Sequence, residues 1–439
     1  KNNLYGGIFM RKYLLGLSLL LAFGLILGAC SSSDSASSDG KVEIEFWYGL
    51  GSEADKKMKE IISDFNAEHE DIEVIPVPQA DYTETYEKLQ AAIASNTAPG
   101  IFIAEVTPMT DLASKEALEP LDKFLDEDDS FDEEDFLASL ISPGKMDGSM
   151  YMLPGYGSAQ VMYYRKDIFE NAGVDPEEAF ASWENLAEAS RTLIDSGEVN
   201  VGHMPMWGYE NLVDIALSNG GSILNDDGTE VLIDSPEWIE SWEFIREQIH
   251  DEENMKINSG GQGWEYWYKT IDQVMNGSAA SYTGSSGDKG DLDFDKIDSH
   301  IQPGLNGKDP APEVTGLYLG IPSSISEEEK EAAYEWMSYF TSSEVNADWS
   351  KTIGYVPTRN STTEEPVYAD FVAENPYANV PYEQAQISTP EFIDPTGGKI
   401  IDALSIATDK VQIENIPVEE ALKKAKEDAQ AALDEVNNK

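Results

Sequence analysis

Residues 42–104 have the sequence VEIEFWYGLGSEADKKMKEIISDFNAEHEDIEVIPVPQADYTETYEKLQAAIASNTAPGIFIA, which alternates strand-like with helix-like segments and thereby decides the fold. Apolar and acidic residues alternate at 42–46, which predicts a strand with one buried face. Four apolar residues at helical spacing predict the first helix: Met58, Ile61, Ile62 and Phe65. Residues 72–77 and 101–104 predict two further strands, and 86–95 predict a helix between them. The order strand, helix, strand, helix, strand predicts an α/β fold with a parallel sheet and right-handed crossovers.

The chain is long enough for two domains. Its 439 residues exceed the roughly 250–300 at which a single hydrophobic core stops growing. Residues 327–340 and 418–436 predict two late helices, and the sequence contains no internal repeat. We therefore expect two α/β domains, with an irregular, aromatic-rich segment between the regular first part and the late helices.

The N-terminal region has the pattern of a bacterial lipoprotein signal. Arg11 and Lys12 precede an uncharged apolar segment at 14–27, and small residues lead into Cys30. A positive start, an apolar segment and small residues before the cleavage site define an export signal, and a cysteine at the new N-terminus supplies a thiol for a diacylglycerol anchor. The apolar segment is shorter than the ~20 residues that a spanning helix needs, which disfavours a transmembrane anchor.

This pattern predicts where the protein works. We expect a signal peptide at residues 1–29, with translated upstream sequence before Met10, and a lipidated flexible tether at 30–40, which is rich in serine. Folded structure is expected from Val42. The protein should be held on the extracellular face of the cell membrane by lipid on Cys30.

The chain is strongly acidic, with 83 Asp and Glu residues, 29 Lys and Arg residues and a formal net charge of −54. Such a surface repels phosphate backbones and anionic lipid headgroups, so nucleic acid is not expected as a partner. The acids are spread through the chain, which favours adaptation to a salty or alkaline exterior over a local acidic patch. Because Cys30 is the only cysteine, no intrachain disulfide can form.

Motifs for catalysis and metal binding are scarce. The four histidines are scattered, and the sequence contains neither a phosphate-binding loop nor a nucleophile elbow. Asp291, Asp293 and Asp295 alternate like the start of a calcium loop, but Lys296 stands where such a loop needs glycine, so no metal is expected. No cofactor is expected either. Paired acids for glycoside hydrolysis stay open, because 83 acids always offer some pair at a workable separation.

Aromatic residues beside glycines and polar residues are the main candidates for ligand binding. Aromatic faces pack against the C–H faces of sugar rings, while neighbouring polar groups fix the ligand's orientation. The candidates are Trp47, Tyr48, Tyr82, Tyr156, Trp207, the cluster at 264–268, Tyr282, Tyr355 and Tyr382. Five tryptophans in helical patterns are expected in the core instead: Trp183, Trp238, Trp242, Trp336 and Trp349.

Ordered motifs from about residue 43 to 436 resemble a known family. They are Phe46-Trp47, Phe65-Asn66-Ala67-Glu68, Ala98-Pro99-Gly100-Ile101-Phe102, Leu118-Glu119-Pro120-Leu121, Leu153-Pro154, Tyr163-Tyr164-Arg165-Lys166-Asp167, Trp183-Glu184-Asn185-Leu186, Met275-Asn276-Gly277, Thr341-Ser342-Ser343-Glu344 and Gly354-Tyr355-Val356-Pro357. In this order and spacing, the chain resembles the extracellular solute-binding proteins of sugar-type ABC transporters. The resemblance implies a two-lobed periplasmic-binding-protein-like fold of type II, with the ligand cleft between two α/β lobes.

The resemblance also implies how the chain divides between the lobes. Residues 41–158 and 311–350 would form the first lobe, and 159–310 and 351–439 the second. The chain would first cross the hinge near Ser158.

Glycerol-3-phosphate-binding members of the family give the closest motif-by-motif alignment. The resemblance implies ligand contacts at Tyr82, Glu105, Ser158, Ser285, Ser286, Gly316 and Tyr355. The aromatic candidates Trp47, Tyr48, Trp207 and Tyr282 complete the expected site. The arginine that would meet phosphate has no counterpart, because the corresponding segment 389–396 carries no basic residue.

The sequence therefore predicts a lipid-anchored, non-enzymatic binding protein for a neutral carbohydrate, with an oligosaccharide favoured, that serves an ABC importer. A buried phosphate needs a charge-assisted partner, whereas a neutral glycan needs aromatic faces and hydrogen bonds. Its expected partners are the ligand, the transmembrane permease subunits and the membrane, and the protein is expected to be a monomer. Two alternatives stay open: a binder of glycerol phosphate or a glycerophosphodiester, and a surface glycoside hydrolase.

Overall fold

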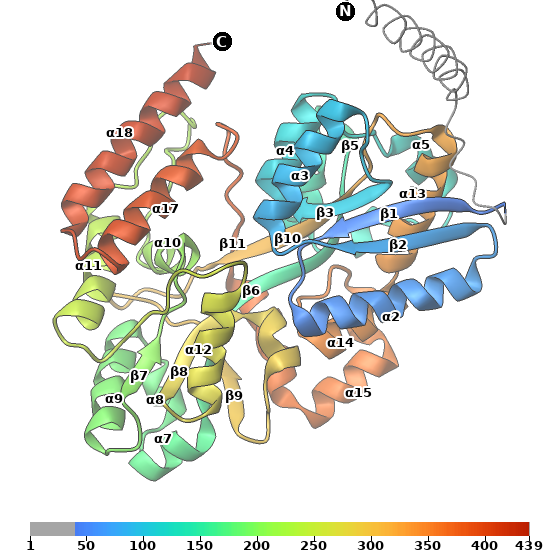
Figure 1. The fold of residues 1–439 in the computed structure, drawn as a ribbon. Helices are drawn as coiled ribbons and strands as arrows, with labels where there is room; N and C mark the ends of the chain where they lie inside the picture. The colour runs from blue at the N-terminus through green and yellow to red at the C-terminus, as the bar shows by residue number, and fades with distance from the viewer. Residues whose placement is uncertain (1–39, 439) are drawn as a thin grey trace, which may run out of the picture.

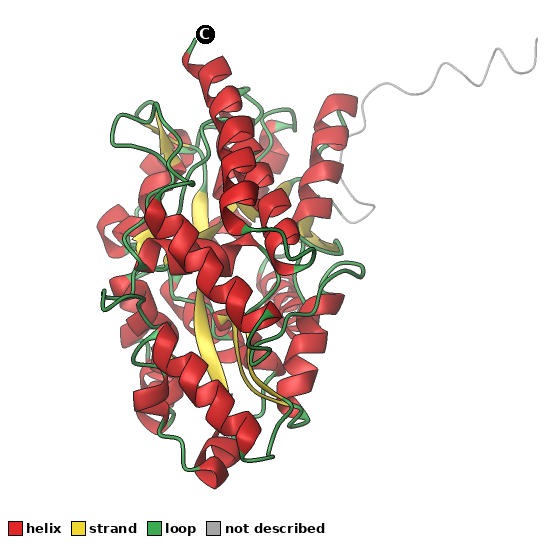
Figure 2. Cartoon of the chain, turned by 90° about the vertical axis from the view of Figure 1, so that its left-hand side faces the viewer, coloured by secondary structure: helices red, strands yellow, loops and turns green. Residues whose placement is uncertain are grey.

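The computed structural model describes residues 40–438. The predicted signal peptide, Cys30 and all but the last residue of the predicted tether lie outside the described residues. One nine-stranded sheet runs through the interior of the described part, and helices cover its outside (Figure 2). Between residues 40 and 438, no helix is both long and apolar enough to cross a bilayer.

The N-terminal segment folds as its periodicity predicts. It contains β1 (Val42–Tyr48), α2 (Ser52–Glu68), β2 (Ile72–Pro78), α3 (Tyr82–Ser95) and β3 (Ile101–Glu105). β1 pairs in parallel with both β2 and β3, which confirms the predicted parallel arrangement of these three strands. Helix α3 begins four residues earlier than predicted, because the side chain of Asp81 accepts a hydrogen bond from the backbone N–H of Glu84 and caps the helix at Tyr82.

Two long strands join the two ends of the sheet. β10 (Glu313–Gly320) runs antiparallel to β3 and to β6 (Leu153–Arg165), so the sheet as a whole is mixed. β6 pairs with β10 as far as Ala159 and with β8 (Ala279–Ser285) from Gln160 onward. The remaining strands of the sheet are β7 (Val201–Met204), β9 (Ile297–His300) and β11 (Thr389–Pro390), and a separate hairpin contains β4 (Lys145–Met146) and β5 (Ser149–Met150).

We call the part of the molecule built around β1, β2 and β3 the first lobe (Figure 1). Its core packs Phe46 of β1 against Trp336, and Trp349 against Phe340. The helices of this lobe include α4 (Val106–Ser114), α5 (Asp122–Glu127), α6 (Ala138–Ile141), α13 (Glu327–Phe340) and α14 (Ser343–Ile353), with α15 (Pro366–Glu374) against α14.

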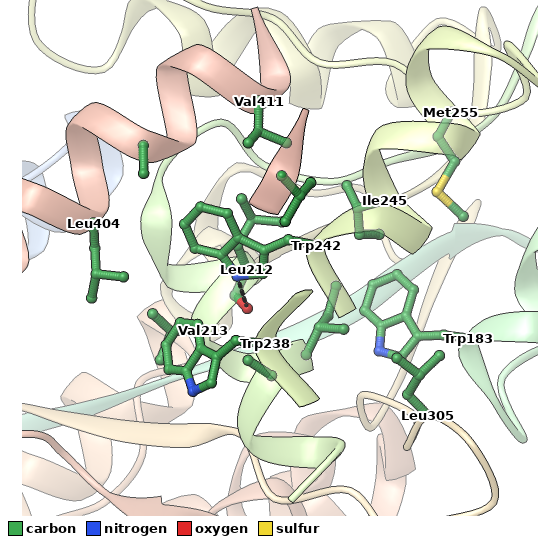
Figure 3. Close-up of a cluster of buried hydrophobic side chains, with 14 of the residues drawn as sticks. Trp183, Leu212, Val213, Trp238, Trp242, Ile245, Met255, Leu305, Leu404 and Val411 are labelled. Atoms are coloured by element: carbon green, nitrogen blue, oxygen red, sulfur yellow. Dashed lines mark hydrogen bonds between the residues drawn. The ribbon is translucent and has the colours of Figure 1, made fainter. Parts of the chain in front are cut away.

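We call the part built around β7, β8 and β9 the second lobe. Its core contains Trp183, Trp238 and Trp242, and the indole N–H of Trp242 donates to the carbonyl of Leu212 at 3.0 Å (Figure 3). All five tryptophans that were predicted in the core are fully buried, which confirms that prediction. The helices are α7 (Lys166–Ala172), α8 (Pro176–Ala179), α9 (Trp183–Asp195), α10 (Tyr209–Ser218), α11 (Pro236–His250), α12 (Glu265–Met275), α16 (Val380–Ile387), α17 (Lys399–Gln412) and α18 (Val418–Asn437).

The contacts near residue 350 bear on the predicted division of the chain. Ile353 packs in the core of the first lobe, although the resemblance assigns 351–439 to the second. Helices α17 and α18 pack in the core of the second lobe. The lobe boundaries inferred from the resemblance stay a prediction.

Candidate ligand-binding cleft

A cavity of about 420 Å³ lies between the two lobes. The first lobe lines it with the loop after β1, the start of α3 and the end of β3. The second lobe lines it with the starts of α10 and α12, the segment after β8 and the start of α17. Ser158 and Gln160 of β6 and Thr315 of β10 line it where these strands pass between the lobes.

Strand ends and glycines bring the lining residues into position. The parallel strands β1 and β3 both end at this edge of the sheet, the usual place for a ligand in an α/β fold. The loop after β1 lies close to the start of α3, since a Cβ on Gly49 would lie 2.2 Å from the carbonyl carbon of Asp81. Gly208 precedes α10 with a φ of +132°, which favours glycine, and thereby allows Glu210 to fold back toward it.

Aromatic side chains cover both walls of the cavity. The nine that line it are Tyr82, Tyr86, Tyr209, Trp264, Tyr266, Trp267, Tyr268, Tyr355 and Phe392. Tyr355 stacks on Tyr156 with ring centroids 4.4 Å apart, and the hydroxyls of Tyr156 and Tyr82 are 3.0 Å apart. These contacts fix the ring orientations and give the cleft rigid apolar faces with polar edges.

The two lobes touch each other at several residues beside the cavity. The backbone N–H of Ser52 donates to the hydroxyl of Tyr268 at 2.9 Å, and the rings of Tyr82 and Trp264 meet edge to face at 5.9 Å. Elsewhere, the backbone N–H of Asp394 donates to Thr107 Oγ1 at 3.2 Å. The structure is therefore a closed arrangement of the lobes.

Acidic side chains are the second feature of the lining. Eight line the cavity: Glu105, Glu210, Asp214, Asp288, Asp291, Glu313, Glu391 and Asp402. Among the described residues that line it, none is lysine, arginine or histidine. The ammonium of the adjacent Lys289 is bound instead by the backbone carbonyls of Lys351 and Thr352.

Five of these carboxylates accept hydrogen bonds from other residues of the protein. Asp214 accepts from Gln302 Nε2 at 2.6 Å and from the N–H of Glu313 at 2.9 Å. Asp288 accepts from Trp267 Nε1 at 2.7 Å and from the hydroxyl of Tyr282 at 3.0 Å. The other three bonds are Gly316 N–H to Glu391, Phe392 N–H to Glu313 and Ser52 Oγ to Asp291.

Burial shifts the ionisation of these groups strongly. It raises the pKa of Asp214 to about 7 and the pKa of Asp288 to about 8, although the hydrogen bonds to both carboxylates act in the opposite direction. Burial and the nearby carboxylate of Asp214 raise the pKa of Glu313 to about 8. Burial also holds the pKa of Glu391 well above its usual range. Near neutral pH the cleft therefore holds protons that carboxyl groups in water would release.

Glu105 and Glu210 lie on opposite lobes. Glu105 is the last residue of β3, and its side chain accepts no hydrogen bond within residues 40–438. Glu210 lies in the first turn of α10, where its carboxylate contacts its own backbone N–H. Partial desolvation by the surrounding protein raises the pKa of both to about 7, and Glu210 adds to the rise for Glu105. Both side chains are exposed to the cleft, so solvent screens their charges and their contribution to stability is small.

Five of the residues expected from sequence line the cavity: Tyr82, Glu105, Ser158, Ser285 and Tyr355. The hydroxyls of Ser158 and Ser285 are 2.9 Å apart and link β6 to the end of β8. Here the resemblance brought together residues that are far apart in the sequence.

The other six expected residues lie outside the lining, three of them on β1 or immediately before α10. Tyr48 is fully buried in the core, with its hydroxyl on Asp55. Side chains alternate along a strand, so Trp47 points to the other face of the sheet, where its indole donates to Glu45. Trp207 lies behind the lining. Its ring meets that of Tyr266 edge to face with centroids 4.8 Å apart, and its indole N–H donates to the carboxylate of Asp409.

The remaining three support the lining from behind. Tyr282 is fully buried and donates to Asp288. Ser286 is also fully buried, and its hydroxyl accepts from the N–H of Ala159. Gly316 lies where a Cβ would meet the hydroxyl of Tyr318 at 2.4 Å, and its N–H holds Glu391.

Several lining residues were missing from the expected site. The cluster at 264–268 had been noticed for its aromatic residues, and four of its five residues line the cavity at the start of α12. Gln160, Tyr209, Glu210, Glu313 and Glu391 carry no local signal, because they reach the cavity through strand crossings and helix packing.

Comparison with known proteins agrees with this architecture. Residues 60–376 match the family described as Bacterial extracellular solute-binding protein. The sn-glycerol-3-phosphate-binding periplasmic protein UgpB of Brucella melitensis is 24% identical over 432 residues, which cover 94% of this chain and 96% of that protein.

Two solved structures share the fold. UgpB from Mycobacterium tuberculosis, in complex with glycerophosphocholine, superposes with a TM-score of 0.79 at 21% identity and covers 90% of this chain and 99% of that one. The GacH receptor of Streptomyces glaucescens, solved unliganded and with acarbose, has a TM-score of 0.79 at 18% identity and covers 89% and 98% of the two chains. The predicted α/β periplasmic-binding-protein fold is confirmed. The chain belongs to the bacterial extracellular solute-binding protein family.

Proposed function

We propose that the protein is the lipid-anchored substrate-binding component of an ABC importer, which captures a carbohydrate, with an oligosaccharide favoured, and delivers it to a membrane permease. The observation that carries the proposal is the cavity of about 420 Å³ with aromatic walls from both lobes. This volume lies within the roughly 300–1,000 Å³ of typical ligand sites. The family is one of solute-binding proteins rather than enzymes, so the cleft carboxylates are assigned to binding.

The two walls offer what sugar rings need. Tyr82 and Tyr355 present rings from the first lobe, while Trp264, Tyr266 and Trp267 present rings from the second. Apolar ring faces can hold the C–H faces of a sugar, and the acids and hydroxyls around them can accept or donate to its hydroxyl groups. A ligand that touches both walls stabilises the closed arrangement more than the open one.

A phosphate-bearing ligand fits the same cavity poorly. Relatives include proteins named for glycerol-3-phosphate and one solved with glycerophosphocholine. Eight acids and no basic side chain line this cavity within the described part of the chain. A phosphate would meet like charges without the charge-assisted donors that a buried anion requires.

The attachment and the partner follow from sequence and family. The residues before Cys30 support a lipid anchor on the extracellular face of the membrane. Solute-binding proteins of this kind hand their ligand to the transmembrane permease of the importer.

Binding to a ligand panel tests the proposal. Thermal shift against mono-, di- and oligosaccharides, followed by calorimetric titration, should identify a saccharide that stabilises the fold. A ligand at about 100 times its dissociation constant adds about 2.7 kcal/mol. Glycerol-3-phosphate and glycerophosphocholine belong in the same panel. Binding of either one, with no saccharide bound, would overturn the carbohydrate assignment, and cleavage of a bound glycan would overturn the non-enzymatic one.

A further inference from the structure

The cleft carries negative charge that the protein itself does not balance. None of the eight lining acids forms an ion pair with a lysine, arginine or histidine within residues 40–438. The ammonium of Lys289, adjacent to Asp288, is bound by backbone carbonyls in the last turn of α14. Buried charges are normally paired. The buried carboxyl groups of Asp214 and Asp288 hold protons near neutral pH, whereas Glu105, Glu210 and Asp402 are exposed to the cleft and open to a bound cation.

Three of the eight accept no hydrogen bond from another residue of the described part; of these, only Glu105 lies on the first lobe, and Glu210 and Asp402 lie on the second. Asp214, Asp288 and their hydrogen-bonded neighbours have donors in the protein, which fixes their positions. Glu105 has no donor, and Glu210 has only its own backbone N–H. Glu105 and Glu210 line the cavity from opposite lobes, and the charge of Glu210 contributes to the raised pKa of Glu105. Closure therefore brings together two carboxylates that the protein leaves free.

The chemistry of the walls limits which cation can fill this position. No group of three or more His, Cys, Asp or Glu side chains between residues 40 and 438 is arranged to hold a metal ion. Tyr82, Tyr209 and Tyr266 line the same cavity as the two carboxylates. Aromatic faces beside carboxylates suit an organic ammonium group, which gains from both cation–π attraction and ion pairing.

We propose that the ligand is a saccharide that carries a protonated amino group, and that this group binds between Glu105 of the first lobe and Glu210 of the second. The inference rests on the proposed carbohydrate-binding function and names the ligand class for the same cleft. It replaces the neutral glycan that the sequence alone favoured.

The proposal supplies a reason for closure. A ligand shifts the lobes toward the closed state only by the contacts that are stronger there. An ammonium group can meet both carboxylates only when the lobes are closed. Without it, closure sets Glu105 against Glu210, which is unfavourable once both are ionised. The ligand thus converts a repulsion between the lobes into an attraction.

The proposal also predicts the pH dependence of binding. Binding an ammonium group favours the ionised carboxylates, so it should release protons, and affinity should rise as the pH increases from 5 to 7. The titratable groups that interact electrostatically with the two carboxylates are acids and tyrosines: Asp81, Tyr82, Tyr156, Tyr209, Asp214, Tyr266, Glu313 and Glu391. Ionisation of the other acids in this group also makes affinity for an ammonium group rise with pH, and the tyrosines stay neutral throughout this range.

Matched saccharide pairs test the proposal by calorimetry. Glucose is compared with glucosamine, and cellobiose and cellotriose are compared with the β-1,4-linked dimer and trimer of glucosamine. Each pair replaces a 2-hydroxyl by a 2-amino group and keeps rings and linkage. We expect the amine member of at least one pair to bind more than tenfold tighter at pH 7, with affinity that rises between pH 5 and 7.

Charge-neutralising variants locate the effect. Glu105→Gln and Glu210→Gln keep the shape of each side chain, and each should reduce the preference for the amine member at least fivefold. Asp226→Asn removes one charge from an exposed position outside the cavity lining, and it should leave the preference unchanged. If one glutamine variant fails to fold, the other variant, on the opposite lobe, and the wild-type pH profile carry the test.

The possible failures are distinguishable. Equal or tighter binding of the neutral member in every pair would overturn the amine assignment and leave the carbohydrate function standing. Binding of no saccharide at all would contradict both. A preference that survives both glutamine variants would overturn the assigned position of the amino group.

Discussion

Raising the pH from 6.5 to 8 is expected to destabilise the unliganded protein. Asp214 and Asp288 are only 3% and 6% exposed, and burial raises their pKa values to about 7 and about 8. In the unfolded chain both carboxyl groups titrate near pH 4. Across this window only the folded state holds their protons, and stability falls with rising pH wherever the folded state binds more protons.

The size of the effect follows from these two groups. Between pH 6.5 and 8 the folded state holds on average roughly 0.4 proton on Asp214 and roughly 0.8 on Asp288. At about 1.4 kcal/mol per proton and per pH unit, the free energy of unfolding should fall by about 2 kcal/mol over this range. Glu105 and Glu210 are left out because they are exposed to the cleft. The half-buried Glu313 and Glu391, whose pKa values are also raised, act in the same direction, so this figure is a lower bound.

Two other groups set the limits of the window. Burial lowers the pKa of His203 to about 3, so below pH 6.5 the unfolded state binds an extra proton on His203, which offsets part of the slope from the two carboxyl groups. Burial, with a smaller effect of Lys351, lowers the pKa of Lys289 to about 8. Above pH 8 the unfolded state likewise binds an extra proton on this lysine. Between these limits neither group opposes the negative slope from the two carboxyl groups strongly.

Urea unfolding followed by tryptophan fluorescence at constant ionic strength measures the effect. Asp214→Asn and Asp288→Asn should each flatten the slope between pH 6.5 and 8, whereas Asp226→Asn should keep the wild-type slope. A free energy of unfolding that stays constant or rises across this window would refute the account of the buried carboxyl groups.

Three further predictions concern the cleft wall, the surface and the anchor. Trp264→Ala should weaken binding of the tightest saccharide about thirtyfold, or about 2 kcal/mol, whereas Trp47→Ala, outside the lining, should change the affinity less than twofold. Equal losses of affinity in calorimetry would contradict the assignment of Trp264 to the cavity wall. The melting temperature should rise from low to molar salt as carboxylate repulsion is screened, and a flat or falling curve would count against environmental adaptation. Cys30→Ser should abolish lipid attachment without affecting the fold, and mass spectrometry that detects unmodified Cys30 in membrane-extracted wild-type protein would contradict the anchor.

The first lobe could be predicted well from its sequence because the spacing of its apolar residues clearly distinguishes strands from helices. Residues 42–104 alternate period-two and helical patterns, and the structure places β1 to β3 there as predicted. The start of α3 was missed because a single capping side chain, Asp81, decides it rather than periodicity. The crossing of β6 and β10 between the lobes depends on pairing at long range, which no local pattern encodes.

The cleft was predictable only in part. Motif alignment found Ser158 and Ser285, whose hydroxyls meet although 127 positions separate them. It missed Glu210 and Glu391, because whether an acid faces a cavity or solvent depends on how separate segments pack. Tyr48 and Tyr282 shared the glycine-rich surroundings of the lining aromatics, yet strand alternation buries both.

A crystal structure with the tightest saccharide of the panel tests the central claim most directly. The account predicts that the sugar occupies the cavity between the lobes, with rings against Trp264 or Tyr266 and an amino nitrogen within hydrogen-bonding distance of both Glu105 and Glu210. A saccharide bound elsewhere on the protein, or one whose amino group points away from both carboxylates, would contradict it.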